Sequence, residues 1–170
     1  MKGMRTILGI SLMVLIVCAI GYIFWQQEMK YWLPTPVPAA LKQVSMGDHV
    51  SIDVIRQERD KPLFIHFYNF DCPCSRFNVN EFQSMYYRYR DQVEFLALVQ
   101  SSDPSQELVS KFQRMLGVPI ATLVDTNGEV AQSLGVYATP QAVIMDNQSR
   151  VFYKGNYNAA RYCTSKSTKF

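Results

Sequence analysis

The sequence has few cysteines and little net charge. Four cysteines occur among 170 residues, and Cys18 lies within a long apolar run, so a small domain held together by disulfide bonds is excluded. The formal net charge is only +3. Leaving Lys2, Arg5 and Lys30 out of the 17 basic residues, and Glu28 out of the 14 acidic ones, gives 14 and 13 for the rest of the chain. Nucleic-acid binding requires a clustered basic face and is therefore not expected.

Charged side chains are absent from residues 6–25, a run of 20 mostly apolar residues. A helix of this length crosses a hydrocarbon core of about 30 Å, so the run predicts a single transmembrane helix through which the chain contacts the membrane. A cleaved signal peptide is the alternative. Its apolar core would span only about 7 to 15 residues and would end at a small-residue cleavage site, which is missing here. We therefore expect an uncleaved anchor.

The charges on either side of this run predict its orientation. Lys2 and Arg5 precede it, whereas Glu28 and Lys30 follow it, so the positive-inside rule places the N-terminus in the cytoplasm. Residues after about Met29 then lie in the periplasm or outside the cell, where disulfides form and persist. The predicted location is the cytoplasmic (inner) membrane, crossed once.

A proline-rich stretch separates the anchor from the rest. Three prolines occur within residues 34–38, which predicts a stiff extended spacer. We divide the chain into an N-terminal membrane anchor at residues 1–30, a spacer at residues 31–44 and a folded domain at residues 45–170. About 130 residues outside the membrane are enough for a core of their own.

Hydrophobic periodicity predicts an α/β domain. Strands are expected at residues 50–55, 63–68, 93–99, 120–124, 141–145 and 150–154. Helices are expected from the residues after Cys72 to about Arg90, from a cap at Asp103 to Gly117, and over a turn or two at residues 129–134. Strands that alternate with helices favour parallel pairing, whereas the last two strands form an antiparallel hairpin. A mixed central sheet with helices on both faces accommodates both parts.

Two cysteines, Cys72 and Cys74, stand at a predicted strand-to-helix junction with Pro73 between them. Proline suits the first position of a helix, which leaves Cys72 at or next to the N-cap. The unpaired amides and the dipole of a helix N-terminus stabilise a thiolate. Cys72 is therefore the predicted nucleophile, and Cys74 is the thiol expected to resolve a mixed disulfide.

Three segments together resemble the thioredoxin-like superfamily, and more closely its redoxin branch, the alkyl hydroperoxide reductase/thiol-specific antioxidant family with the membrane-anchored thioredoxins. These segments are residues 67–74, 123–131 and 136–144. The similarity covers roughly residues 50–157. It implies a thioredoxin-like fold and thiol-disulfide exchange. The chain departs from most relatives in having one residue, rather than two, between its cysteines.

The resemblance also implies site residues. Pro140 is expected to be a cis-proline that faces the cysteines, and Thr139 is expected to pair through its backbone with a substrate strand. His66 precedes Cys72 by six residues, a position that in many thioredoxins holds a buried acid that moves protons during exchange. Either His66 serves as this acid or base, or it is a core histidine satisfied by one hydrogen bond.

These observations predict a membrane-anchored extracytoplasmic thiol-disulfide oxidoreductase that acts on protein thiols or disulfides through the Cys-Pro-Cys pair. These observations imply a redox partner that the sequence does not identify, and they do not imply an organic cofactor.

Three points stay open in the sequence. A thiol peroxidase of the redoxin branch is one alternative, although Asn69 and its neighbours do not match the pattern that such enzymes have before the attacking cysteine. A copper-binding, chaperone-like module is another, with Cys72 and Cys74 as ligands and His66 or Cys163 completing the shell. Cys163 itself is either a resolving thiol for Cys72 or Cys74 or an inert thiol in a last helix.

Overall fold

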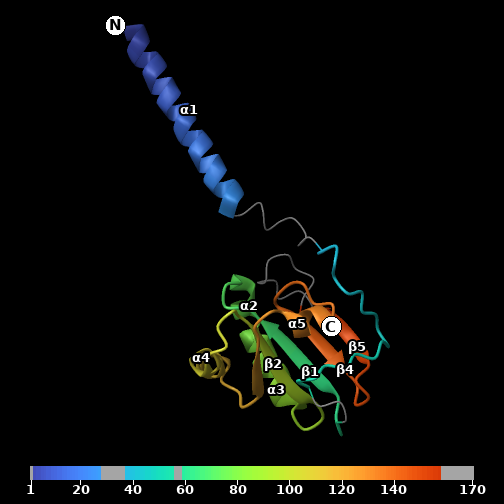
Figure 1. The fold of residues 1–170 in the computed structure, drawn as a ribbon. Coiled ribbons are helices and arrows are strands. Elements are labelled where there is room, and N and C mark those ends of the chain that lie inside the picture. The colour runs from blue at the N-terminus through green and yellow to red at the C-terminus, as the bar shows by residue number, and fades with distance from the viewer. Residues whose placement is uncertain (1, 28–36, 56–58, 158–170) are drawn as a thin grey trace. The chain divides into compact units, whose positions relative to one another are not determined.

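The computed structural model describes residues 2–27, 37–55 and 59–157 (Figure 1). The chain divides into two units, Met1–Pro36 and Val37–Phe170, and each unit is considered by itself. Residues 31–36 of the predicted spacer lie outside the described residues.

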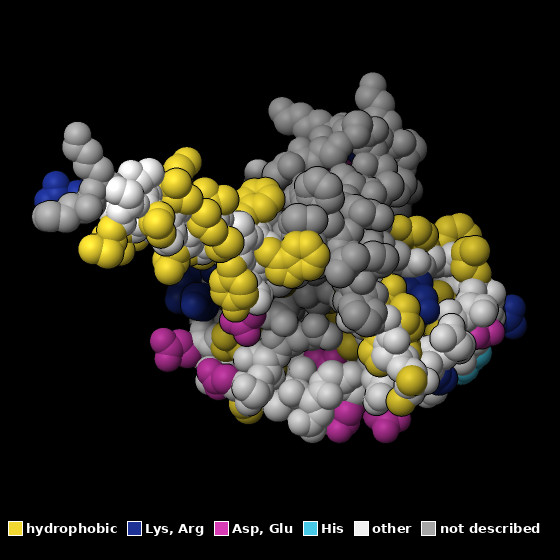
Figure 2. Space-filling model, turned by 90° about the horizontal axis from the view of Figure 1, so that it is seen from above, with side chains coloured by type: hydrophobic (Ala, Val, Ile, Leu, Met, Phe, Trp, Pro, Cys, Tyr) yellow, Lys and Arg dark blue, Asp and Glu magenta, His cyan; other side chains and the backbone are white. Residues whose placement is uncertain are grey.

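The first unit contains helix α1, Lys2–Gln27. Its stretch Gly3–Gln27 is long and apolar enough to cross a membrane. Its large apolar side chains are exposed, and Figure 2 shows them in yellow on the helix. In water such a surface would cost about 25 cal/mol for each Å² of apolar area, which is why a lipid environment suits this helix.

The second unit is built on a five-stranded sheet in the order β3-β2-β1-β4-β5 (Figure 1). The strands are β1 Leu63–Tyr68, β2 Glu94–Gln100, β3 Ala121–Asp125, β4 Gln141–Met145 and β5 Val151–Asn156. Strand β1 pairs in parallel with β2, and β2 in parallel with β3. Strand β4 pairs antiparallel with both β1 and β5. The predicted mixed sheet is therefore confirmed.

Helices cover both faces of this sheet, as predicted. The helices of the domain are α2 Pro73–Phe77, α3 Val79–Tyr89, α4 Gln106–Leu116 and α5 Glu129–Ser133. On one face Phe82 of α3 and Phe112 of α4 pack with Tyr68 of β1. On the other face Leu134, at the end of α5, packs with Phe67 of β1. Because its side chains are buried on both faces, β1 consists of an unbroken apolar run apart from His66.

The expected strand at residues 50–55 is absent from the structure. Only an isolated bridge between His49 and Arg150 forms there. Val50, Ile52 and Ile55 are nevertheless buried in the core that contains Phe67. The alternation of apolar residues at positions 50–55 therefore predicted burial correctly. It did not predict that these residues lack a neighbouring strand with which to form a ladder of hydrogen bonds.

Two predicted helix boundaries also differ. Helix α4 is capped by Ser105, whose Oγ accepts a hydrogen bond from the Leu108 amide at 3.2 Å, rather than by Asp103. The Asp103 carboxylate instead accepts bonds from the amide and the hydroxyl of Ser105, both at 2.9 Å. The helix that follows the cysteines is interrupted at Asn78, which separates α2 from α3.

Candidate active site

Cys72 stands at the N-cap of α2, four residues beyond the end of β1, and Pro73 occupies the first turn of the helix. Both predictions are confirmed. The backbone of Cys72 is extended, with φ −96° and ψ 110°, as an N-cap requires. Its thiol is free and half-buried. The sulfur of Cys72, the predicted nucleophile, is therefore held at the carboxyl end of the central strand.

The loop between β1 and α2 is held by Asn69. Its side-chain oxygen accepts a hydrogen bond from the Asp71 amide at 2.8 Å, and its carbonyl accepts one from the Cys72 amide at 3.2 Å. Its own amide donates to the hydroxyl of Ser75 at 3.3 Å, and Ser75 is completely buried. These bonds fix the first turn of α2 against the end of β1.

The peptide bond between Thr139 and Pro140 is cis, as the resemblance implied. These residues directly precede β4, which pairs with β1. The Cys72 thiol donates a hydrogen bond to the carbonyl oxygen of Thr139, with 3.1 Å between Sγ and oxygen. The structure thus brings together Cys72 and Thr139, which are 67 residues apart in the sequence.

Cys74 is disulfide-bonded, and its partner is neither Cys72 nor Cys18, because both of these are free thiols. The Cys74 carbonyl accepts a hydrogen bond from the side-chain amide of Asn78 at 3.0 Å. The sequence predicted that Cys72 and Cys74 exchange with each other. The structure describes a state in which Cys74 is oxidised and Cys72 is reduced.

Sequence reasoning missed Tyr68 and Arg76. Burial raises the pKa of Tyr68, the nearby Arg76 guanidinium lowers it by charge and hydrogen bonding, and the electrostatic effect of Cys72 raises it. The Tyr68 hydroxyl also donates to the sulfur of Met115 at 3.2 Å. A phenol and a guanidinium therefore belong to the surroundings of Cys72. Arg76 follows Cys72 by four residues, a helical spacing that could have identified it.

His66 lies in a buried aromatic cluster on the face of the sheet that α3 covers. Its Nδ1 is hydrogen-bonded to the Tyr157 hydroxyl, and its ring centroid is 4.6 Å from that of Phe82. Burial lowers its pKa to about 3, so the ring is uncharged at neutral pH. The described neighbours of the His66 ring are the aromatic rings of Tyr68, Phe82 and Tyr157. A role for His66 in proton transfer stays a prediction.

Cys163 lies outside the described residues, so its predicted roles as a resolving thiol or a copper ligand are not observed. Within residues 2–27, 37–55 and 59–157, no three His, Cys, Asp or Glu side chains gather closely enough to hold a metal ion.

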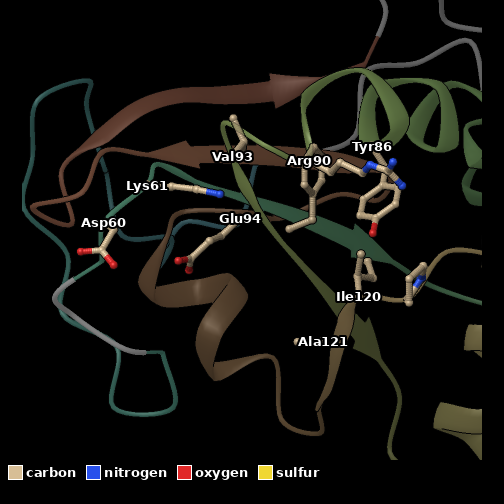
Figure 3. Close-up of a pocket in the computed structure, with 10 residues that line it drawn as sticks. Asp60, Lys61, Tyr86, Arg90, Val93, Glu94, Ile120 and Ala121 are labelled. Carbon is tan, nitrogen blue, oxygen red and sulfur yellow. The ribbon is translucent and has the colours of Figure 1, made fainter.

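A cavity of about 490 Å³ lies near the beginnings of β1, β2 and β3 (Figure 3), whereas Cys72 follows the end of β1. It is lined by residues that precede or begin β1, β2 and β3 and by the end of α3. Figure 3 shows Asp60, Lys61 and Glu94 gathered on one side, and Tyr86 of α3 and its C-cap residue Arg90 on the other. The cavity is lined by side chains of both charges, and Cys72 is not among its lining residues.

Comparison with known proteins places this domain in a family. Residues 42–170 match the model of a family described as "Domain of unknown function (DUF6436)". The chain belongs to this family. The DUF6436 chain is also similar to the thiol-disulfide oxidoreductase ResA of Bacillus thuringiensis subsp. konkukian (strain 97-27), with 21% identity over 157 residues, which cover 89% of this chain and 87% of ResA.

Solved structures show which fold the DUF6436 domain has. An uncharacterized conserved protein from Geobacillus kaustophilus superposes with a TM-score of 0.58 at 22% identity, covering 76% of this chain and 77% of its own. A Chlorobium tepidum protein assigned as the thiol:disulfide interchange protein DsbE gives a TM-score of 0.54 at 14% identity, covering 66% and 85%. The domain has a thioredoxin-like fold, as the sequence predicted.

Proposed function

We propose that this chain is a membrane-anchored, extracytoplasmic thiol-disulfide oxidoreductase that acts on thiols or disulfides of proteins. One observation carries the proposal: the free thiol of Cys72 at a helix N-cap contacts the Thr139 carbonyl beside the cis bond to Pro140. The similarity to ResA, itself a thiol-disulfide oxidoreductase, along nearly the whole chain supports the same activity.

The reaction begins at Cys72. Its thiolate attacks one sulfur of a substrate disulfide, a bond forms between Cys72 and that sulfur, and the electron pair leaves on the second substrate sulfur. Once Cys74 is a thiol, it attacks Cys72, closes a Cys72–Cys74 disulfide and releases the substrate as a second thiolate. Two electrons have then passed from the cysteine pair to the substrate. The reverse sequence oxidises a substrate dithiol.

The substrate is proposed to bind along the backbone beside Thr139 and Pro140. An extended peptide that pairs with this backbone would place its own cysteine next to Cys72, because the Thr139 carbonyl is only 3.1 Å from the Cys72 sulfur. Main-chain pairing depends little on the sequence of the partner, so the site suits protein substrates in an extended conformation. An attacking distance of about 3 to 3.5 Å between sulfur atoms is then within reach.

The anchor and spacer complete the proposal. Residues 1–30 hold the chain in the cytoplasmic membrane, residues 31–44 separate the domain from the lipid, and residues 45–170 carry the chemistry in the periplasm or outside the cell. The long apolar helix α1 supports this arrangement. A redox partner in the same compartment restores the cysteines after each turnover.

The test uses the full chain in detergent and follows reduction of a disulfide-linked fluorescent peptide by thiol. Wild-type protein is expected to accelerate the reduction, whereas Cys72→Ser is expected to abolish the acceleration. Cys74→Ser should leave the first attack intact and accumulate a mixed disulfide between peptide and Cys72. Cys18→Ser is the matched control, since Cys18 lies in α1, and should behave as wild type. Full activity of Cys72→Ser would overturn the proposal.

A further inference from the structure

Two positively charged side chains lie beside the predicted nucleophile, and the proposed reaction uses neither of them. Arg76 is exposed and follows Cys72 by four residues, about one helical turn. Lys111 of α4 is also exposed, and its Nζ lies 4.8 Å from the centre of the Phe70 ring. We propose that Arg76 and Lys111 form a basic patch that recognises acidic side chains close to the reacting cysteine of a protein substrate. The inference rests on the proposed function and names its class of substrate.

Helix α4 is packed against the loop that carries Cys72, and this packing places Lys111 near the loop. Phe112 of α4 is completely buried. Its ring centroid is 5.0 Å from that of Tyr68, at the end of β1, and 6.4 Å from that of Phe70, in the loop. Lys111 directly precedes Phe112 and lies over the Phe70 ring in a cation–π contact. Because Phe70 is two residues before Cys72, this contact keeps a positive charge beside the reactive loop.

Arg76 brings the second positive charge to the same loop. Burial raises the pKa of Tyr68, and the Arg76 guanidinium opposes this rise by charge and hydrogen bonding, so the two groups are close together. The same hydroxyl is near enough to Cys72 to be affected by it electrostatically. Tyr68 is completely buried, whereas Arg76 is exposed. The guanidinium can therefore contact a bound partner while it remains next to the thiol.

The two cations of the basic patch are not neutralised within the domain. Three acidic residues, Asp71, Glu81 and Glu107, lie only four or five positions from Arg76 or Lys111 along the chain. Within residues 59–157, however, no ion pair joins Arg76 or Lys111 to a carboxylate. Both charges are therefore available to carboxylates of a substrate, with which a guanidinium forms strong charge-assisted hydrogen bonds.

Lys111 and Thr139 belong to parts of the chain on opposite sides of β1. Strand β4, which follows Thr139, pairs with one side of β1, and β2, which leads into α4, pairs with the other side (Figure 1). A substrate strand that pairs beside Thr139 and presents its cysteine to Cys72 therefore continues toward α2 and α4. Side chains two to four residues beyond that cysteine lie about 7–13 Å farther along an extended strand, where they meet the basic patch. One ligand has to reach both places, which favours a polypeptide over a small thiol.

The first experiment compares three disulfide-linked fluorescent peptides that differ only in the residues near the cysteine, which are Glu, Gln or Lys. Full-length protein in non-ionic detergent is assayed for kcat/KM at salt concentrations of about 0.1 M and about 1 M, where the Debye length is about 10 Å and about 3 Å. At low salt, kcat/KM for the Glu peptide should exceed that for the Gln peptide at least about fivefold, and the Lys peptide should be slowest. At high salt the preference should fall below about twofold.

The outcomes separate the inference from the proposed function. Equal kcat/KM for the three peptides at low salt, in a protein whose activity requires Cys72, would overturn the inference and leave the proposed function standing. Inactivity toward all three peptides would overturn both. Glutathione disulfide carries carboxylates but is too short to pair as a strand. Its reduction at a higher kcat/KM than the Glu peptide would overturn the assignment of a protein substrate.

The second experiment reverses the charges of the basic patch. Arg76→Glu and Lys111→Glu should each lower the ratio of kcat/KM between the Glu and Lys peptides at least about fivefold, and the double variant should prefer the Lys peptide. A loss of folded protein lowers kcat/KM for both peptides equally and cannot reverse the preference. Arg88→Glu is the matched control, because Arg88 of α3 lies over the Tyr89 ring at 5.5 Å, as Lys111 lies over a ring in α4's contact with the loop, and it should keep the wild-type ratio. A wild-type ratio in both single variants would overturn the inference.

Discussion

The sulfur of Cys72 donates a hydrogen bond to the carbonyl oxygen of Thr139 across 3.1 Å. This contact joins the N-cap of α2 to the residue before β4, so the reactive thiol and the peptide backbone beside it are positioned by two different parts of the sheet. A thiol at this place can both hydrogen-bond to the protein and meet an incoming strand. The contact uses the backbone of Thr139 and the side chain of Cys72 only.

Replacing Cys72 by serine should therefore remove the disulfide-reduction activity while leaving the free energy of unfolding nearly unchanged. A hydroxyl can donate to the same carbonyl, so the free energy of unfolding should change by no more than about 0.5 kcal/mol. Disulfide reduction should fall by at least about a thousandfold, since an alcohol does not exchange with disulfides. Urea unfolding and the peptide assay measure the two effects. A large loss of stability would show that the thiol has a structural role that the contact does not explain.

Ser75 offers a test of the loop that carries the cysteines. Its buried hydroxyl accepts the Asn69 amide, so Ser75→Ala should leave that donor unpaired and cost about 1–3 kcal/mol of unfolding free energy. Ser84→Ala is the matched control. Ser84 is exposed and its hydroxyl donates to the carbonyl four residues earlier in α3, so its loss should cost no more than about 0.5 kcal/mol. Equal costs would contradict this account of the loop.

Much of the fold could be predicted because, in several segments, the local sequence pattern agrees with the structure that forms. The run at residues 63–68 is apolar on both faces and became β1 with the predicted bounds. Pro73 marked the first turn of α2, and the hairpin near the end became β4 and β5. In these segments the preferences of neighbouring residues and the tertiary contacts agree.

The remaining features depend on contacts between residues far apart in the sequence. Periodicity cannot reveal that His66 meets Tyr157, 91 residues later, or that Cys74 has a disulfide partner other than Cys72. At residues 50–55 the sequence predicted a strand that does not form. Alternating apolar and polar residues indicate a half-buried segment, but they do not show whether a partner strand is present. Tyr68 looked like an ordinary strand residue until the structure placed Arg76 near it.

Gly135 is expected to be intolerant of any side chain. Its φ is +66°, and an added Cβ would lie 2.7 Å from the Lys42 carbonyl oxygen and 2.8 Å from the Lys154 Nζ. Gly135→Ala should therefore combine a left-handed backbone cost of about 1–2 kcal/mol with overpacking of about 1–3 kcal/mol. Gly128 has φ +70° with nothing within 4 Å of a Cβ, so Gly128→Ala should show the backbone cost alone. Urea unfolding of both variants decides, and equal losses would argue against the steric contribution.

His66 should make the domain sensitive to acid. Its pKa is about 3 in the folded protein, because of burial, and about 6.5 when the chain is unfolded. Between these values the unfolded state binds the extra proton, so stability is present above about pH 6.5 and declines as the pH falls toward 3. The slope from this residue approaches about 1.4 kcal/mol per pH unit. The neighbouring Tyr157 has a raised pKa and stays neutral over this range.

The measurement is the free energy of unfolding of wild type and His66→Gln between about pH 7 and pH 4.5. Glutamine can still hydrogen-bond to Tyr157 but does not titrate, so the difference between the two proteins should shrink by about 2–3 kcal/mol across this interval. Parallel pH profiles for wild type and His66→Gln would contradict the lowered pKa.

The membrane arrangement predicts which cysteines a reagent can reach from outside the cell. A chain that keeps only Cys72, with the other three cysteines changed to serine, should react with a membrane-impermeant maleimide in intact cells, because the domain follows the span and Cys72 is only half-buried. A chain that keeps only Cys18 should stay unlabelled in intact cells, since lipid surrounds that residue in α1. A cysteine introduced by Met4→Cys, before most of the span, should be labelled only after lysis. Labelling of Cys72 only after lysis would place the domain in the cytoplasm, where reducing conditions would keep its cysteines as thiols, and would contradict the proposed extracytoplasmic function.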